Sequence, residues 1–269
     1  MVDFSDFNSL VSLADYFVDE HTCKAFLAEQ RWGDTVVCPY CGETHVYTCK
    51  NDRYKCAKCA NTFSAKVGTI FEDTNLPLRK WFMAMYLVSS HKKGISSCQL
   101  ARDIEVTPKT AWNMLQKIRT LYSQHGGCQL RNEVEMDEMY LGGRETNKHE
   151  SKKMEGTQGR STKTKTPIFG MTERGGNTIV MKVADTKMAT LMPIIKKYVK
   201  EHSEVFTDEL SAYSKLGENG YKHNVVCHSV KEFVNGKIST NSIEGFWGHF
   251  KRCIFGIYHF VSPKYLQRY

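Results

Sequence analysis

Two Cys-x-x-Cys pairs near the N-terminus constrain the fold of this chain more than any other feature. Cys38 and Cys41 form the first pair, Cys56 and Cys59 form the second, and 14 residues lie between them. The surrounding β-prone stretches are interrupted by Pro, Gly and Asn and are too short to bury a core of their own. Four thiolates are ligands that a structural zinc ion prefers, and each pair presents two sulfurs to one metal. The spacing therefore predicts a zinc ribbon over residues 35–66.

The alternative for these cysteines is a redox-active dithiol. Such a dithiol calls for a single Cys-x-x-Cys at the start of a helix in a βαβ unit, which the sequence does not offer. A disulfide framework is also disfavoured, because five of the ten cysteines cluster within this short region. His45 and Cys49 lie between the pairs at the wrong spacing, and we expect them to be spare. Zn²⁺ is thus the expected structural ion.

Helical periodicity flanks the ribbon on both sides. Residues 1–34 are expected to form an N-terminal helical segment and residues 67–128 a helix-turn-helix region. Thr107 suits an N-cap and Pro108 the first position of a second helix. The exposed face of that helix suits the major groove of DNA, although helical hairpins that only pack are the alternative. This face is predicted to carry Lys109, Asn113, Gln116 and Lys117.

Residues 129–269 read as strand, loop, strand, strand, helix, strand and helix, which predicts an α/β domain. Three acids in this region are candidates for a common site: Asp137, Asp208 and Glu244. If the fold brings them together, their oxygens suit a divalent metal ion. Alternation places Glu133 and Glu135 on the same strand face as Asp137, so the pattern alone does not choose among these three.

The charge balance favours an anionic partner. Lys and Arg total 37 against 29 Asp and Glu, which gives a net charge of +8. Residues 144–166 are polar throughout, carry seven Lys or Arg against three Glu, and are interpreted as a basic loop between two strands. Nucleic acid is the leading candidate, because neutralised phosphates release counterions. The alternatives are that the excess charge only aids solubility and that the loop is a solvated segment with no role.

No membrane association is expected. The N-terminus lacks a basic start followed by an unbroken apolar stretch. No apolar run approaches the roughly 20 residues that span a bilayer. We therefore expect a soluble, intracellular protein.

Eight motifs follow one another in order from about residue 20 to the end of the chain. They are CPYCG, CAKC, FSAKVGTIFEDTNLPLRKWFMAMYLV, LARDIEVTPKTAWNMLQKIR, VEMDEMYLGGR, KTPIFGM, VFTDELSAY and STNSIEGFWGHFKRCIFGIYHFVSPKYLQRY. In this order they resemble the transposases of the IS1595 and ISXO2-like group, to which the eukaryotic Merlin elements are also similar.

The resemblance implies an RNase H-like catalytic domain that cuts and joins DNA with a DDE triad. The family's three acidic positions fall on Asp137, Asp208 and Glu244, and its following Lys falls on Lys251, two helical turns after Glu244. The acids would hold two Mg²⁺ ions, or Mn²⁺, that activate the attacking oxygen and stabilise the leaving oxygen. Lys251 and Arg252 would hold flanking phosphates or a terminal base.

The resemblance also implies a partner, double-stranded DNA, in the form of the element's inverted repeats and its target. Pairing two ends implies a homodimer or a larger assembly. The expected location is the cytoplasm, in association with the nucleoid, in a bacterial host and the nucleus in a eukaryotic one. The chain stops at Tyr269, where relatives continue with further helical sequence, so a truncated copy is expected.

Two other functions stay open. One is a catalytically inactive or domesticated DNA-binding protein that uses only the zinc ribbon and the helix-turn-helix. The other is a metal-dependent nuclease that cuts DNA without joining it. Retention of all three acids in the sequence argues against the inactive protein.

Overall fold

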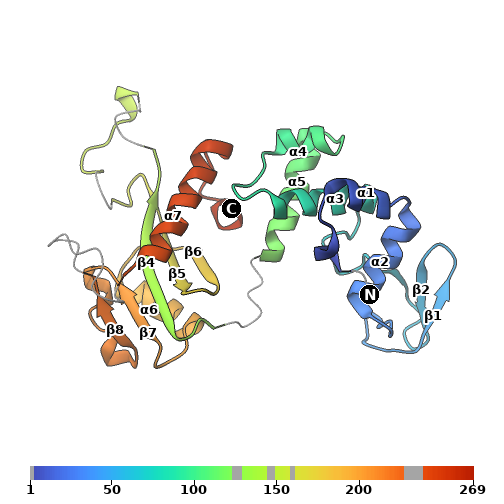
Figure 1. The fold of residues 1–269 in the computed structure, drawn as a ribbon, viewed down its shortest axis with the longest axis horizontal. Coiled ribbons are helices and arrows are strands. Elements are labelled where there is room, and N and C mark those ends of the chain that lie inside the picture. The colour runs from blue at the N-terminus through green and yellow to red at the C-terminus, as the bar shows by residue number, and fades with distance from the viewer. Residues whose placement is uncertain (1–2, 123–128, 144–148, 158–160, 227–238) are drawn as a thin grey trace. The chain divides into compact units, whose positions relative to one another are not determined.

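The chain divides into two compact units, residues 1–123 and 124–269 (Figure 1). The computed structural model describes residues 3–122, 129–143, 149–157, 161–226 and 239–269. Parts of the expected basic loop, residues 144–148 and 158–160, lie outside the described residues. Within the described ranges, no helix is both long and apolar enough to cross a bilayer.

Five α-helices in the described part of the first unit share one core. They are α1 (Leu10–Tyr16), α2 (Glu20–Trp32), α3 (Leu78–Ser90), α4 (Ser97–Asp103) and α5 (Pro108–Tyr122). At its centre the ring of Phe17 lies 5.0 Å from the ring of Phe26 and 4.7 Å from that of Phe82. Helices as short as α1 are marginal alone and depend on tertiary packing. The N-terminal helices and the helix-turn-helix region therefore form one body.

The predicted helix-turn-helix consists of α4 and α5. Between them Glu105 adopts a left-handed backbone conformation with φ of 53°. The Oγ1 of Thr107 accepts a hydrogen bond from the backbone N–H of Thr110 at 3.2 Å, which is the expected N-cap. Each helix buries an apolar stripe, which includes Leu100 and Ala101 in α4 and Ala111, Met114, Leu115 and Ile118 in α5. Residues close in sequence thus form the turn and the N-cap of this helix-turn-helix.

The prediction for the exposed face of α5 is wrong at one residue, Gln116. The side chain of Gln116 is only 4% exposed, so the prediction that it faces solvent is wrong. The reason is that α5 packs on α3 as well as α4, which widens its buried face. Lys109, Asn113 and Lys117 are exposed as predicted.

A small antiparallel sheet completes the first unit. Its strands are β1 (Val46–Cys49), β2 (Arg53–Cys56) and β3 (Thr62–Ser64), in the order β1-β2-β3. Its core is centred on Phe63, which stacks on Tyr54 and meets the edge of Trp32 from α2. So few apolar side chains cannot stabilise the sheet alone.

The second unit is built on one five-stranded mixed sheet. Its strands are β4 (Glu133–Leu141), β5 (Thr166–Glu173), β6 (Thr178–Lys182), β7 (Glu204–Thr207) and β8 (Lys222–Val225). Their order is β6-β5-β4-β7-β8, with antiparallel pairing from β6 to β4 and parallel pairing from β4 to β8. The predicted α/β content is confirmed, but the sequence did not reveal β8, whose residues KHNV show no apolar alternation.

Two helices cover opposite faces of this sheet. α6 (Met188–Tyr198) packs on the face formed by Val134 and Met136. α7 (Asn241–Cys253) packs on the other face, which carries Met139 and Ile168. Because side chains alternate along a strand, the odd-numbered acids of β4 share the face that α7 covers.

α7 approaches the sheet closely at Gly170 of β5, which pairs with Asp137 of β4. A Cβ atom on Gly170 would lie 2.6 Å from Cζ2 of Trp247 and 2.9 Å from Cδ1 of Ile243. Real Cβ atoms do not approach neighbours so closely. The absence of a side chain at this position therefore lets the helix lie directly on the strands.

The side chain of Gln267, in the C-terminal segment, bonds to the backbone of the edge strand β6. The Oε1 of Gln267 accepts a hydrogen bond from the backbone N–H of Lys182 at 2.7 Å, and its Nε2 donates to the carbonyl of Val180 at 3.1 Å. The side-chain amide makes the pair of bonds that a neighbouring strand would make.

Candidate functional site

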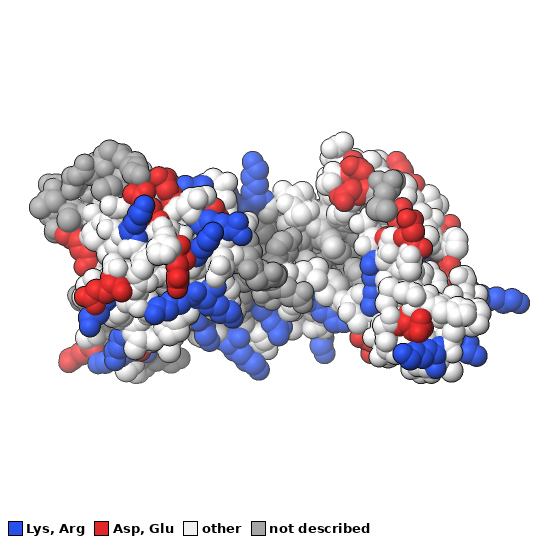
Figure 2. Space-filling model, turned by 90° about the horizontal axis from the view of Figure 1, so that it is seen from below, with Lys and Arg blue, Asp and Glu red and all other residues white. Residues whose placement is uncertain are grey.

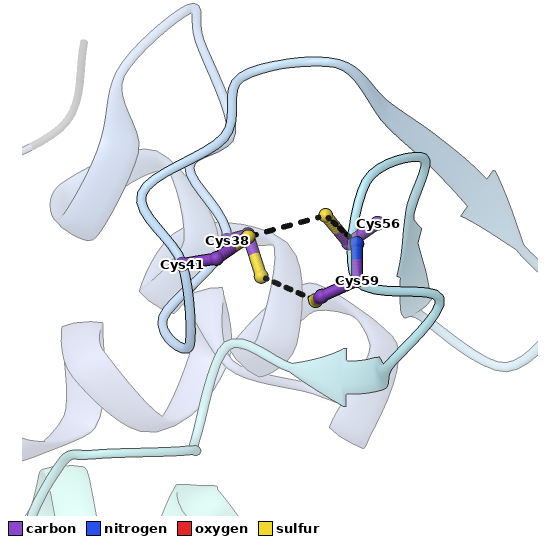
Figure 3. A group of neighbouring side chains, drawn as sticks. All are labelled: Cys38, Cys41, Cys56 and Cys59. Atoms are coloured by element: carbon purple, nitrogen blue, oxygen red, sulfur yellow. Dashed lines mark hydrogen bonds between the residues drawn. The ribbon is translucent and has the colours of Figure 1, made fainter.

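The four cysteines of the two pairs converge on one point between two loops (Figure 3). The Sγ atoms of Cys38 and Cys59 are 3.7 Å apart, and those of Cys41 and Cys56 are 3.6 Å apart. A tetrahedral zinc ion with Zn–S bonds of about 2.3 Å places its sulfurs about 3.8 Å from one another. The arrangement fits a structural zinc ion.

The local backbone also favours thiolate formation. The N–H of Cys59 points at the Sγ of Cys56 at 3.5 Å, and this hydrogen bond is the main cause that lowers the pKa of the Cys56 thiol, whereas burial and the neighbouring thiols raise the pKa of Cys41. Metal binding requires the deprotonated form, so a lowered pKa assists it. Cys49 is exposed on β1, and neither it nor His45 belongs to the cysteine group found in the described residues.

In the second unit, strand pairing brings Asp137 and Asp208 together. β4 and β7 are parallel, with Glu135 beside Phe206, so two further residues along each strand lead to the two aspartates. Asp208 directly follows the last residue of β7, at the carboxyl end where such sheets expose functional side chains. Asp137 and Asp208, which are 71 residues apart in the sequence, are thus neighbours in the fold.

A carboxylate that the sequence did not single out joins this pair. Oxygens of Asp137, Glu138 and Asp208 all lie within 4.8 Å of one another. Glu138 points to the α6 face, where it is 8% exposed and its Oε2 accepts a hydrogen bond from the hydroxyl of Tyr213 at 3.0 Å. Alternation alone assigns adjacent strand residues to opposite faces. Because Asp208 lies beyond the end of its strand, it can be approached from both faces.

The environment of Asp137 suits a cation. Burial, with a smaller contribution from the charges of Asp208 and Glu244, raises the pKa of its carboxyl group to about 6. A hydrogen bond from the indole Nε1 of Trp247 to its Oδ2, 3.1 Å long, orients the carboxylate. Desolvated acids that repel one another are stabilised by a bound cation.

Glu244 approaches the aspartates from α7. It is exposed in the first turn of that helix, and its Oε1 accepts a hydrogen bond from the hydroxyl of the buried Thr240 at 2.8 Å. Its charge acts on Asp137, but its oxygens are not part of the compact group of three acids. The structure therefore brings together two of the three predicted acids directly and places the third nearby.

The structure also separates the acids that alternation left equivalent. Glu135 is 1% exposed and is hydrogen-bonded to Arg174 and to the start of α7. Glu133 lies at the far end of β4 and is ion-paired with the same arginine. Of these three acids of β4, Asp137 is the one grouped with Asp208 in the described structure.

The donor set of the acidic group fits Mg²⁺ or Mn²⁺. All its ligand atoms are carboxylate oxygens, which hard cations prefer. Two oxygens on opposite sides of a Mg²⁺ ion are about 4.2 Å apart, which is compatible with a group whose oxygens lie within 4.8 Å.

The basic residues predicted to contact DNA are mostly exposed. Lys251 and Arg252 lie in the last turn of α7, and Lys109 lies near the start of α5. Lys117 is already engaged, because its Nζ donates to the carbonyls of Ile70 at 3.2 Å and Glu72 at 3.5 Å. On the face shown in Figure 2, Lys and Arg are interspersed with Asp and Glu on both units.

Family models match two parts of the chain. The ISXO2-like transposase domain matches residues 129–269, and the transposase zinc-ribbon domain matches residues 18–62. A protein of Halobacterium salinarum, described as an uncharacterized protein in transposable element ISH50, is 32% identical over 241 residues that cover 85% of this chain and 81% of that protein. An uncharacterized transposase-like protein of Haemophilus influenzae is 37% identical over 70 residues, which cover 26% of this chain and 56% of that protein.

Solved structures of the Mos1 transposase are similar over part of their length. The strand transfer complex matches 64% of this chain and 73% of that chain, with 11% identity and a TM-score of 0.23. The paired-end complex with the left transposon end matches 64% of this chain and 77% of that chain, with 11% identity and a TM-score of 0.21. Similarity at this level carries no conclusion about fold or function.

A zinc-ribbon unit followed by an α/β unit with an acidic cluster defines a protein with two separate candidate metal sites. The domain matches and the Halobacterium relative then identify it: the chain belongs to the ISXO2-like transposase family. The resemblance inferred from the eight motifs is confirmed.

Proposed function

We propose that this chain is a DNA transposase that binds the inverted repeats of a mobile element, cleaves its 3′ ends and joins them to target DNA. The observation that carries the proposal is that Asp137, in the middle of β4, lies beside Asp208, directly after the end of β7, with the charge of Glu244 acting on Asp137 from α7. The sheet order β6-β5-β4-β7-β8, with helices on both faces, agrees with an RNase H-like catalytic domain.

Each acid has a task in this chemistry. Bound Mg²⁺ or Mn²⁺ supplies Lewis-acid stabilisation of the attacking and leaving oxygens in an in-line phosphoryl transfer. Asp137, Asp208 and Glu244 would hold the ions, and Trp247 fixes the orientation of the Asp137 carboxylate. Water attacks first and releases a 3′-OH, and this hydroxyl then attacks the target phosphodiester. Both steps exchange one phosphate–oxygen bond for another, so no covalent enzyme intermediate is required.

Four of the remaining predicted residues, two on α5 and two on α7, bind DNA in this proposal. Lys109 and Asn113, exposed on α5, suit base edges and phosphates in the major groove. Lys251 and Arg252 lie on the same helix as Glu244, where their charges can hold phosphates that flank the cut. The zinc ribbon supplies a folded platform held by Cys38, Cys41, Cys56 and Cys59, which would share one zinc ion.

Transposition joins two ends, so the proposal includes a homodimer or a larger assembly on double-stranded DNA. It places the protein with its DNA, in the cytoplasm at the nucleoid of a bacterial host or in the nucleus of a eukaryotic host.

The test uses a labelled duplex made from the DNA that flanks this coding sequence. Asp137→Asn, Asp208→Asn and Glu244→Gln should each lower Mg²⁺-dependent cleavage by at least about two orders of magnitude, because a ligand to the ion is lost. End binding, measured by gel shift, should persist. Glu218→Gln, at an exposed acid in a short 3-10 helix, is the matched control and should cleave like the wild type. Cleavage that survives any of the three changes would contradict the assignment.

A strand-transfer assay separates the proposal from its alternatives. A transposase joins the cleaved end to a second duplex, a nuclease cuts without joining, and an inactive DNA-binding relative only shifts the labelled end.

A further inference from the structure

The carboxylate of Glu135 lies at the N-terminus of α7. Its Oε2 accepts hydrogen bonds from the backbone N–H groups of Ser242 at 2.7 Å and Ile243 at 3.0 Å, and its Oε1 accepts one from the Ser242 hydroxyl at 3.1 Å. The first N–H groups of a helix have no partner inside the helix, and a negative charge there is favoured by the helix dipole. The residue before α7, Thr240, makes no side-chain cap. A strand residue 107 positions earlier therefore caps this helix.

Arg174 ties the same carboxylate to the chain that leads into α7. Its Nε donates to Oε1 of Glu135 at 2.7 Å, and its NH2 donates to the backbone carbonyl of Ser239 at 2.8 Å. Its guanidinium also lies over the ring of Phe206 at 4.1 Å. A carboxylate that is 1% exposed is stable only if it is paired and hydrogen-bonded, and Arg174 provides the opposite charge.

These contacts give α7 two fixed points on the sheet. The first is Glu135, at the first turn. The second is Trp247, whose indole donates to Asp137 and whose ring lies against Gly170. Glu244 lies between Ser242 and Trp247 in the sequence, so both fixed points determine where its carboxylate stands.

Glu135 is not placed to bind a metal itself. Both of its oxygens already accept hydrogen bonds, four in all with Arg174, Ser242 and Ile243 as donors. The acidic group found among the described residues contains Asp137, Glu138 and Asp208 instead.

We propose that Glu135 and Arg174 form a clamp on the first turn of α7 that positions Glu244 over Asp137 and Asp208. The two clamp residues are positioning residues of the metal site. This inference rests on the proposed function, because it concerns the same acidic site.

The test compares Glu135→Gln with the wild-type full-length chain. A Gln side chain keeps one acceptor oxygen but turns an NH2 group toward donors that the carboxylate satisfied, so the first turn of α7 is released. Changes to groups that orient metal ligands cost about 10- to 100-fold in metal affinity. We therefore titrate the protein with Mn²⁺ in the absence of DNA and detect the free ion by electron paramagnetic resonance. The Mn²⁺ concentration at half-saturation, the midpoint, should rise by at least about tenfold.

Cleavage of the labelled duplex should report the same displacement. The Mn²⁺ concentration that gives half-maximal cleavage by Glu135→Gln should rise in parallel, while the rate at saturating Mn²⁺ recovers to within a few-fold of the wild type. Asp137→Asn, which removes a ligand, should not recover. Glu133→Gln is the matched control, because Glu133 pairs with the same Arg174 at 3.2 Å but is the first residue of β4, two positions before Glu135, and its midpoint should stay near the wild-type value.

Two results would overturn the clamp. One is an unchanged Mn²⁺ midpoint in folded Glu135→Gln. The other is a normal midpoint with cleavage lost at every Mn²⁺ concentration, which would place Glu135 in the reaction itself. If Glu135→Gln does not fold, Arg174→Lys decides, because lysine keeps the charge but cannot bridge Glu135 and Ser239 together, and an unchanged midpoint in that variant would equally reject the clamp.

The outcome for the clamp is distinguishable from the outcome for the proposed function. If Asp137→Asn still cleaves, the proposed catalytic site is wrong whatever Glu135→Gln does. If Asp137→Asn is inactive and the Mn²⁺ midpoint of Glu135→Gln is unchanged, the site stands and the clamp fails.

Discussion

Folding raises the pKa of Asp137. Burial and the neighbouring carboxylates raise its pKa from 3.8 to about 6, so the folded, metal-free chain holds this proton more tightly than the unfolded chain. The penalty for ionising it is absent below about pH 4 and fully present above about pH 6. In the absence of metal, ionisation of Asp137 therefore lowers the free energy of unfolding as pH rises from about 4 to about 6.

The same shift makes metal binding pH-dependent. A divalent ion must displace the proton on Asp137, so the affinity for Mn²⁺ should fall by up to about tenfold per pH unit below pH 6 and level off above it. Titrations with Mn²⁺ between pH 5 and pH 7.5 measure this directly. Asp137→Asn should show a weaker pH dependence, and an equally steep one would assign the titration to another group.

Individual acids also show what local sequence can and cannot predict. Asp137 and Asp208 were predicted from motifs, and strand register explains why they meet. Glu135 could not be distinguished from Asp137, because its partners Ser242 and Ile243 belong to a helix more than 100 residues away. Glu138 was missed because alternation assigned it to the other face, and the hydroxyl of Tyr213, which orients it, is also remote in sequence.

Among the secondary-structure elements, α7 depends most on one small residue beneath it. In Gly170→Ala the new methyl group would collide with Trp247 and Ile243. Overpacking of this kind costs about 1–3 kcal/mol, which urea unfolding of the full chain should reveal as a lower midpoint for the second unit. Binding of Mn²⁺ should weaken too, because Trp247 also holds Asp137.

A glycine on the same helix provides the control. Gly245 has no atom within 4 Å of an added Cβ, so Gly245→Ala should leave packing unchanged and stabilise the helix by up to about 1 kcal/mol. If both substitutions shift the unfolding midpoint in the same direction, close packing at Gly170 is not what limits this position.

Features that depend on residues close in sequence were predicted well. Features that depend on packing or pairing with a distant element were not. The cysteine pairs and the turn between α4 and α5 involve residues close in sequence, so spacing alone located them. β8 pairs only with β7 on one side and carries no apolar pattern. Gln116 is buried because α3 covers a second side of α5, which helical periodicity in α5 cannot indicate.

The division of the chain into two units predicts that its two metal sites can be lost separately. Cys56→Ser removes one of four thiolate ligands, so elemental analysis of the full chain should show loss of zinc, and the ribbon should unfold because its own core is small. The Mn²⁺ midpoint of the acidic site, which lies in the other unit, should not change. Zinc content equal to that of the wild type would contradict the ribbon assignment.

The net charge of the whole protein predicts salt-dependent DNA binding. Each phosphate contact that is lost should lower the slope of log affinity against log salt concentration by about 0.9. Lys109→Ala should produce this change, since Lys109 is exposed on α5. Lys117→Ala should produce less, because the Lys117 ammonium already donates to two backbone carbonyls. Equal slopes for both variants would place the DNA elsewhere on this unit.

The side-chain amide of Gln267 limits the pairing of β6 with a strand of another molecule. An uncovered edge strand offers a row of N–H and C=O groups that a second chain can extend by strand addition, which is a common route to β-aggregates. By bonding to Lys182 and Val180, Gln267 occupies the C-terminal half of that row in β6. The Gln267 side chain thus blocks the addition of a further strand at these positions of β6.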